Sequence, residues 1–262
     1  MLQTLLKVSN LDVSYPLKKD LFGNSREVFP AVCQASFDLF PGETLGVVGE
    51  SGCGKSTLGK AILQLIRPQS GEIMFEQIPY SSMSDADRKY LKKEIQLVFQ
   101  DPYASLNPQI RVGEAIEETA CVHGIGQNAA ERRELVLGLM EKVGLGAEFF
   151  HRYPHQLSGG QRQRIGIARA LIMKPRLLIC DESVSALDVS VQAQVLNLFN
   201  KLKQEMNLSY LFISHDLGVV HYMCDRVLVM QQGRIVEQGE VEELFAHPSH
   251  PYTKQLLRSF RA

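Results

Sequence analysis

The sequence predicts an α/β fold in which short apolar strands alternate with helices. Residues 45–48 form an apolar run typical of a buried strand, a glycine-rich loop follows, and a helix is expected over about residues 55–65. The alternation returns later, where the apolar run 176–180 precedes an expected helix at 191–205 and a further strand at 209–213. Strand, loop and helix in this order are typical of folds that bind phosphates at strand ends.

The loop after the first buried strand carries a complete phosphate-binding pattern. Residues 49–56 are Gly-Glu-Ser-Gly-Cys-Gly-Lys-Ser, which match GxxxxGK[ST]. Glycines let the backbone N–H groups turn toward an anion, and the next helix adds its positive N-terminal dipole. A plain glycine turn is the alternative, but the Gly-Lys-Ser triplet has no packing role there. The predicted nucleotide contacts are Gly49, Glu50, Ser51, Gly52, Cys53, Gly54, Lys55, Ser56 and Thr57.

Length and composition exclude several other classes of protein. The 262 residues suffice for one large domain, with 45% hydrophobic and 22% charged residues as in globular chains. A net charge of -1 gives no indication of a nucleic-acid partner. No apolar run approaches the roughly 20 residues of a membrane span, and no secretory segment is visible, so a cytosolic location is expected. The five scattered cysteines predict neither a zinc site nor a disulfide framework.

The remaining elements follow from local patterns along the chain. Short β-rich segments predict strands at 5–15 and 34–39, and the polar stretch 16–29 between them is expected to be an exposed loop. Residues 95–99 form another candidate strand. Apolar residues recur at helical spacing among charges between 112 and 150, which predicts a helical insertion. Further predicted elements are a helix at 162–173 and strands at 226–230 and 234–236.

Two carboxylates end the apolar strand 177–180. Asp181 is placed to enter a Mg²⁺ coordination shell, and Glu182 is placed to orient or deprotonate water near a γ-phosphate. A polar turn at a strand end is the alternative for this pair. In a chain with a phosphate-binding loop, the pair predicts the metal and catalytic side of the same site.

A second candidate anion site lies at Leu157-Ser158-Gly159-Gly160-Gln161, just before an expected helix. A hydroxyl, two unhindered backbone N–H groups and a helix N-terminus are suited to a phosphate. The segment is far from the first loop in sequence and lacks a Lys-Ser pair. We therefore expect each nucleotide to be bound by the first loop of one subunit and this segment of another.

On these motifs the chain resembles the ATP-binding subunits of ABC (ATP-binding cassette) transporters. Leu157–Arg164 resembles the family's signature motif, residues 185–188 its D-loop with Asp188, and residues 214–216 its switch segment with His215. Gln100 matches the Q-loop, and Tyr15 lies where the family has an adenine-stacking aromatic residue. The resemblance implies that His215 contacts the γ-phosphate and Gln100 binds Mg²⁺ or water. Without the resemblance, His215 would be interpreted as a polar cap on a strand end, Gln100 as a polar strand end and Tyr15 as an ordinary strand aromatic.

The resemblance implies ATP and Mg²⁺ as ligands and assigns a role to each matched residue. The implied catalytic group comprises Glu182, His215 and Gln100. The implied metal ligands are Ser56, Gln100 and Asp181. Nucleotide contacts beyond the first loop are Tyr15, Ser158, Gly159, Gly160, Gln161 and Asp188.

Four segments resemble more narrowly the oligopeptide, dipeptide and nickel importer branch: 99–108, 152–155, 188–197 and 247–253. This implies import of peptides or a related small solute by a peripheral ATPase on the cytoplasmic face of the membrane. Its partners would be a second ATPase subunit, two membrane permease subunits and, indirectly, a solute-binding protein. The transported solute and the choice between homodimer and heterodimer stay open. A coiled-coil DNA-repair ATPase or a tandem-cassette ribosomal protein would need far more chain.

The implied architecture is a RecA-like P-loop core with an antiparallel β-subdomain, over residues 1–100 and 163–236. A helical signature subdomain at 101–162 is inserted in it, and 237–262 form a tail. Tyr103 and Leu106 are expected to be exposed and to meet the permease; the alternative is that both side chains pack inside the helical subdomain. Ser183, where the family usually has proline, is expected to loosen the turn after the carboxylates. The cysteine-rich C-terminal extension of many relatives is missing, so no iron–sulfur cluster is expected.

Overall fold

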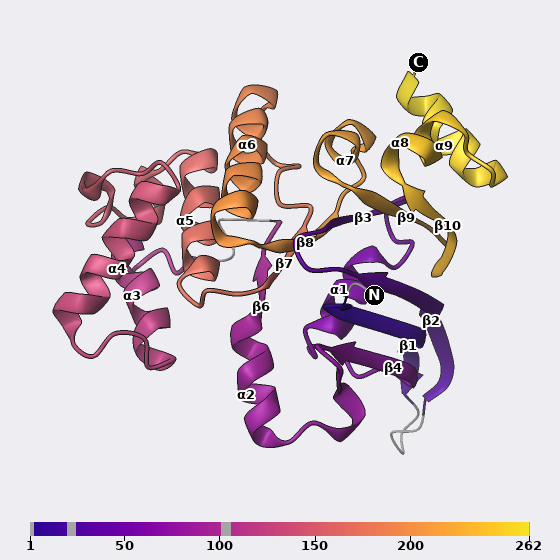
Figure 1. Ribbon diagram of the computed structural model, residues 1–262, viewed down its shortest axis with the longest axis horizontal. Helices are drawn as coiled ribbons and strands as arrows, with labels where there is room; N and C mark the ends of the chain where they lie inside the picture. The colour runs from indigo at the N-terminus through magenta and orange to yellow at the C-terminus, as the bar shows by residue number, and fades with distance from the viewer. Residues whose placement is uncertain (1–2, 20–24, 101–105, 262) are drawn as a thin grey trace. The chain divides into compact units, whose positions relative to one another are not determined.

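The computed structural model describes residues 3–19, 25–100 and 106–261, which form two compact units (Figure 1). The first unit comprises Met1–Lys92 and Ser209–Ala262, and the second comprises Lys93–Leu208. These limits differ from those of the subdomains implied by the resemblance, whose division at 101–162 stays a prediction.

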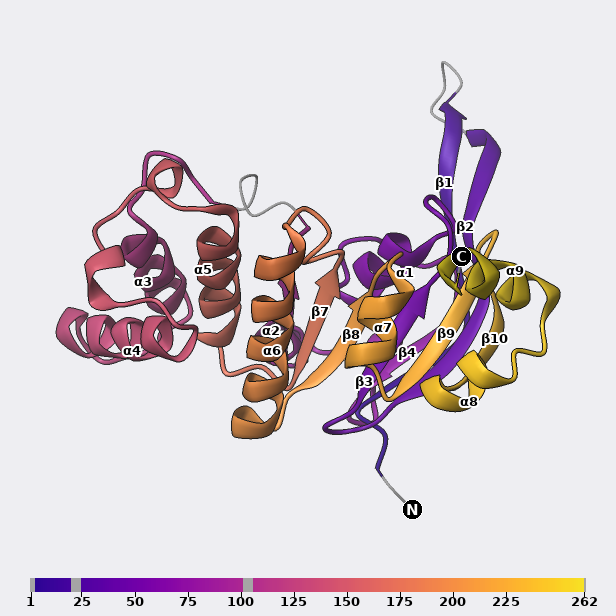
Figure 2. The same cartoon turned by 90° about the horizontal axis from the view of Figure 1, so that it is seen from above.

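The first unit contains an antiparallel sheet with the strand order β2-β1-β4-β5. Figure 2 shows β1 and β2 running side by side as a long ribbon. The antiparallel subdomain is thus confirmed, but the predicted loop at 16–29 is wrong, because residues 16–19 and 25–29 lie in strands. Backbone pairing, such as Pro16 opposite Val28, extends the ribbon without needing apolar side chains. The strand bounds are β1 (Leu6–Lys19), β2 (Ser25–Leu39), β4 (Ser70–Phe75) and β5 (Ile78–Pro79).

A second sheet passes through the first unit in the order β10-β9-β3-β8. Its central strand β3 is buried along its whole length and runs parallel to both neighbours, as a continuous apolar run predicts. The phosphate-binding loop therefore begins at the carboxyl end of a central strand. The bounds are β3 (Thr44–Val48), β8 (Ser209–Ile213), β9 (Arg226–Gln231) and β10 (Arg234–Glu240), with helices α1 (Lys55–Ile62) and α7 (Leu217–Met223).

The chain ends in two helices that belong to the core of the first unit. They are α8 (Val241–Ala246) and α9 (Pro251–Arg261), beside β9 and β10 in Figure 1. Tyr252 and Leu257 share one buried cluster with Val48 and Val229. The tail therefore packs directly behind the strand that carries the phosphate-binding loop.

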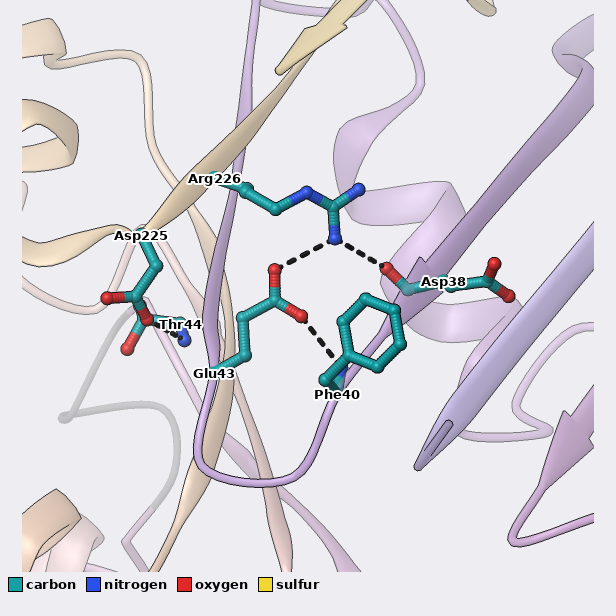
Figure 3. Close-up of polar contacts among 6 residues, drawn as sticks. All are labelled: Asp38, Phe40, Glu43, Thr44, Asp225 and Arg226. Atoms are coloured by element: carbon teal, nitrogen blue, oxygen red, sulfur yellow. Dashed lines mark hydrogen bonds and ion pairs between the residues drawn. The ribbon is translucent and has the colours of Figure 1, made fainter. Parts of the chain in front are cut away.

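Polar contacts hold the opposite end of β3 (Figure 3). Arg226 donates to the Glu43 carboxylate at 2.9 Å and to the Asp38 carbonyl at 3.2 Å. The other oxygen of Glu43 accepts the backbone N–H of Phe40, and the Asp225 carboxylate accepts that of Thr44. Glu43 is only 8% exposed, so this ion pair is screened less than a surface pair. The contacts tie β2 and β9 to the start of β3.

Among its described residues, the second unit contains two parallel strands and four helices of more than ten residues. The strands β6 (Ile95–Val98) and β7 (Leu177–Asp181) pair in register, with Val98 opposite Cys180. Helices α3, α4 and α5 pack against one another, which confirms the helical character predicted for 112–150. The helix bounds are α3 (Val112–Val122), α4 (Ala129–Lys142), α5 (Gly159–Leu171) and α6 (Val189–Met206). Helix α2 (Asp85–Glu94) crosses the boundary between the units.

Candidate functional site

The phosphate-binding loop has a backbone that only glycine adopts without strain. Gly49, Gly52 and Gly54 have φ angles of 150°, 81° and 111°. A Cβ on Gly54 would lie 2.1 Å from the Ala31 carbonyl oxygen, whereas a Cβ on Gly52 would meet nothing within 4 Å. The Ala31 backbone therefore packs against the loop at Gly54, while the space beside Gly52 is open. A loop that binds a phosphate needs such an open side.

Lys55 holds this loop from inside. The residue is 4% exposed, and its ammonium group donates to the carbonyl oxygens of Gly49 at 2.8 Å and Glu50 at 3.0 Å. The Tyr15 hydroxyl lies 3.4 Å from the Thr57 hydroxyl, so the predicted adenine-stacking ring stands beside the first turn of α1. Burial raises the pKa of the Cys53 thiol, so this side chain stays neutral within the loop.

His215 follows the strand next to the phosphate-binding loop. Strands β3 and β8 are parallel, with Val47 opposite Ile213, and the Ser214 N–H donates to the Val47 carbonyl. Asp216 caps α7 by accepting the N–H groups of residues 218 and 219. Between these anchored neighbours, the exposed His215 projects at the carboxyl end of the sheet. Within the first unit, Tyr15 therefore lies beside the helix that follows the loop, and His215 follows the strand that pairs with β3.

The second unit brings together the Q-loop glutamine and the predicted catalytic carboxylate. The parallel register of β6 and β7 places Gln100 and Glu182 at matching strand ends, where the Gln100 amide donates to Glu182 at 3.0 Å. Glu182 has a φ of 47°, and its carbonyl accepts both the N–H and the hydroxyl of Ser185. Ser183 is buried in this closed turn, and its predicted loosening effect remains untested.

The second candidate anion segment is a capped helix start. Ser158 accepts the Gln161 N–H at 3.3 Å, while the Gln161 side chain accepts the Ser158 N–H at 2.9 Å. This reciprocal capping box fixes the N-terminus of α5. A Cβ on Gly160 would lie 2.3 Å from the Val191 side chain of α6, whose N-cap is Asp188. The signature and D-loop segments thus pack tightly within one unit.

The predicted metal ligands are divided between the units. Ser56 lies in the first unit, while Gln100 and Asp181 lie in the second. Within the part of the chain that the structure describes, no group of three or more His, Cys, Asp or Glu side chains could hold a metal ion. This donor set fits Mg²⁺, which takes few protein ligands and completes its shell with phosphate oxygens and water.

The structure corrects one predicted surface residue and adds two near the nucleotide loop. Leu106 is only 4% exposed, so the expectation of an exposed docking leucine is wrong, while Tyr103 lies outside the described residues. Phe29 is directly opposite Tyr15 in the β1–β2 register and is half exposed. The Tyr252 hydroxyl accepts the Glu50 N–H at 3.0 Å. The sequence alone did not indicate that Phe29 lies beside Tyr15, because this pairing depends on the register of β1 and β2.

Comparison with known proteins agrees with this geometry. A sequence model described as ABC transporter matches residues 32–185. The dipeptide transport ATP-binding protein DppF and the oligopeptide transport ATP-binding protein OppF of Haemophilus influenzae are each 51% identical, over 97% of this chain and 77% of theirs. The glutathione import ATP-binding protein GsiA of Pectobacterium atrosepticum is 48% identical over 97% of this chain, which spans only 41% of GsiA.

Solved structures show the same fold. The cbiO1 protein of Clostridium perfringens, part of the ABC transporter complex cbiONQ, superposes with a TM-score of 0.80 at 29% identity, covering 94% of this chain and 92% of that one. The MJ0796 cassette, a dimer bound to ADP and Pi, gives 0.78 at 26% identity, covering 90% and 98%. In the described segments of the present chain, no helix is long and apolar enough to cross a membrane.

Proposed function

Because the chain belongs to the ABC transporter family, as an ATP-binding cassette with ATPase activity coupled to transport, we propose that it powers peptide uptake through a membrane permease. The observation that carries this proposal is the phosphate-binding loop, already shaped around Gly52 and held by Lys55. The relatives DppF, OppF and GsiA are named for dipeptide, oligopeptide and glutathione transport, which favours a short peptide as the solute.

Each side chain has a role in this proposal. The loop N–H groups and Lys55 bind the β- and γ-phosphates, and Tyr15 stacks on adenine. Glu182 accepts a proton from the attacking water, and His215 donates to the γ-phosphate. Mg²⁺, held by Ser56, Gln100 and Asp181, would neutralise charge on the phosphates.

The hydrogen bond between Gln100 and Glu182 describes a resting arrangement in this scheme. The carboxylate is already oriented by the glutamine amide at 3.0 Å. Gln100 would offer its amide oxygen to the metal, while Glu182 accepts a proton from water through its carboxylate. The hydrogen bond therefore places the proposed metal ligand beside the proposed base.

The active form in this proposal is a head-to-tail pair of cassettes. Ser158, Gly159, Gly160, Gln161 and Asp188 of one subunit meet the nucleotide on the loop of the other. The dimeric MJ0796 structure with ADP and Pi supports such a pair. The pair would bind two permease subunits at the cytoplasmic face of the membrane, fed by a solute-binding protein. Homodimer and heterodimer are both compatible with it.

Glu182→Gln tests the chemical step. The amide keeps the shape but does not accept a proton, so we expect ATP binding to persist and hydrolysis to fall by at least 100-fold. Glu134→Gln, an exposed glutamate on α4, is the matched control and should retain full turnover. Near-normal hydrolysis by the Glu182 variant would refute the assignment of the base.

Uptake by whole cells tests the solute. A strain lacking this gene should lose uptake of a labelled dipeptide or tripeptide, and the wild-type gene, but not the Glu182→Gln form, should restore it. If the deletion strain instead loses nickel uptake, which the wild-type gene restores, and keeps its peptide uptake, the peptide proposal is rejected. The ATPase assignment would remain intact.

A further inference from the structure

A hydrogen bond joins the C-terminal helix to the phosphate-binding loop. The Tyr252 hydroxyl, on the first turn of α9, accepts the backbone N–H of Glu50 at 3.0 Å. The two residues are 202 positions apart in sequence. We propose that Tyr252 is a positioning residue that holds the phosphate-binding loop in its binding-competent shape; this inference rests on the proposed binding of ATP at that loop.

Tyr252 is itself firmly held. Its side chain is 5% exposed and packs in the cluster that contains Val48, the last residue of β3. Its backbone N–H donates to the His250 ring at 3.2 Å. The Glu237 carboxylate of β10 accepts the N–H groups of Ser249 at 2.7 Å and His250 at 3.0 Å, which fixes the approach to α9. A residue can position a loop only if its own side chain is held in place, and Tyr252 meets this requirement.

The peptide groups around Glu50 are held from two sides. Lys55 donates to the Glu50 carbonyl from inside the loop, and Tyr252 accepts the Glu50 N–H from outside. Beyond this hydrogen bond, Glu50, Cys53 and Tyr252 border a pocket of about 470 Å³, so the outer side of the loop has room to move. The Tyr252 hydroxyl spans this open side to Glu50, and the Gly233 N–H separately donates to the Cys53 carbonyl at 2.9 Å.

This arrangement predicts an effect on affinity rather than on chemistry. Tyr252 touches neither the reacting γ-phosphate nor the water-activating carboxylate in the proposed mechanism. Loss of its hydroxyl lets the loop sample shapes in which its N–H groups diverge, and the fraction of binding-competent loop falls. The apparent Kd is inversely proportional to that fraction and therefore rises, while turnover at saturating ATP is unchanged.

Tyr252→Phe is the test, because it removes only the hydroxyl. The matched control is Tyr80→Phe, whose part-buried hydroxyl also makes a backbone hydrogen bond, to the Ile62 carbonyl at the far end of α1. We expect the Kd for ATP and for ADP to rise about threefold to tenfold in Tyr252→Phe, within the usual range for one lost hydrogen bond. The kcat and the melting temperature should match those of the control.

Three outcomes separate the inference from the function on which it rests. If wild type and Lys55→Ala bind ATP equally, the loop is not the nucleotide site and the proposed function fails. If Lys55→Ala loses binding but Tyr252→Phe binds ATP as wild type does, only the positioning role is overturned. A lower affinity accompanied by a melting temperature well below that of Tyr80→Phe also overturns it, since general unfolding would then explain the loss.

Discussion

The two candidate phosphate-binding segments both contain consecutive or near-consecutive glycines, yet they use them differently. In the first loop, Gly49, Gly52 and Gly54 have positive φ angles that other residues rarely adopt. In the second, Ser158 has an ordinary extended backbone, and Gly160 belongs to a regular helix. Gly160 is required there because Val191 leaves no room for a Cβ. One set of glycines shapes the backbone, and the other permits close packing of helices.

The comparison also distinguishes how each segment is held. The first loop is held by its own Lys55 and also by two residues distant in sequence, namely Ala31, whose carbonyl lies against Gly54, and Tyr252, which accepts the Glu50 N–H. The second is held by its own residues, through the reciprocal bonds of Ser158 and Gln161. A locally held segment forms with its helix, whereas the first loop forms only when the tertiary structure of its unit is complete.

Gly54→Ala should have the largest effect on nucleotide binding. The new Cβ combines a strained φ of 111° with a position 2.1 Å from the Ala31 oxygen, so the loop must rebuild. We expect ATP affinity to fall by at least 100-fold in a direct titration. Gly159→Ala is the control in the other segment, where the nearest atom lies at 3.4 Å and isolated-chain affinity should be unchanged. Equal ATP affinities for Gly54→Ala and Gly159→Ala would show that the two segments do not use their glycines differently.

Gly160→Ala should destabilise the second unit without altering the first loop. Its Cβ would overlap the Val191 side chain, and such overpacking costs about 1–3 kcal/mol. Chemical denaturation should show the loss, and adding Val191→Ala should recover part of it by making space. Gly166→Ala on the same helix, where a Cβ meets nothing within 4 Å, should instead be neutral or stabilising. Failure of the double variant to recover would mean that packing is not the cause.

Ser158→Ala should have a smaller effect, through loss of the helix cap. The hydroxyl accepts the Gln161 N–H, and removing such a cap costs about 1 kcal/mol. Ser158→Gly should cost only a few tenths. Both can be measured by urea denaturation. A cost for Ser158→Ala no greater than that for Ser158→Gly would show that the segment is held by something other than its capping box.

The smallest expected effect concerns the segment that supports the first loop. Burial favours a higher pKa for Glu237, but the nearby Thr253 side chain and the hydrogen bonds from the backbone N–H groups of Ser249 and His250 outweigh it and lower the pKa. A lowered folded-state pKa stabilises above the unfolded value of about 4.3, and this contribution disappears as pH falls through the folded value. Because Glu237 is only partly buried, the effect should stay below about 1 kcal/mol.

The free energies of unfolding of wild type and Glu237→Gln, measured from pH 7 to pH 3, test this contribution. The difference should be greatest near neutrality and shrink toward zero in acid. A difference that is independent of pH would assign the effect to shape rather than to charge.

The elements that carry the candidate site were predictable because their signals are local. The loop at 49–56, the strand before Asp181 and the helix that follows Ser158 each depend on neighbouring residues and on a short-range pattern. Strand β8 lies at the predicted residues 209–213. The strand residues 16–19 and 25–29 were missed because cross-strand backbone pairing holds them, and their polar composition gives no sign of it.

The sequence by itself determined the family, the order of the elements and the chemical identity of the candidate site residues, since these depend on residue type and spacing along the chain. Only the tertiary structure decided that Leu106 is buried, that Glu43 pairs with Arg226 and that Tyr252 reaches Glu50. The last two pairs are 183 and 202 residues apart. Contacts across such separations depend on how strands and helices pack in three dimensions, which no local pattern in the chain specifies.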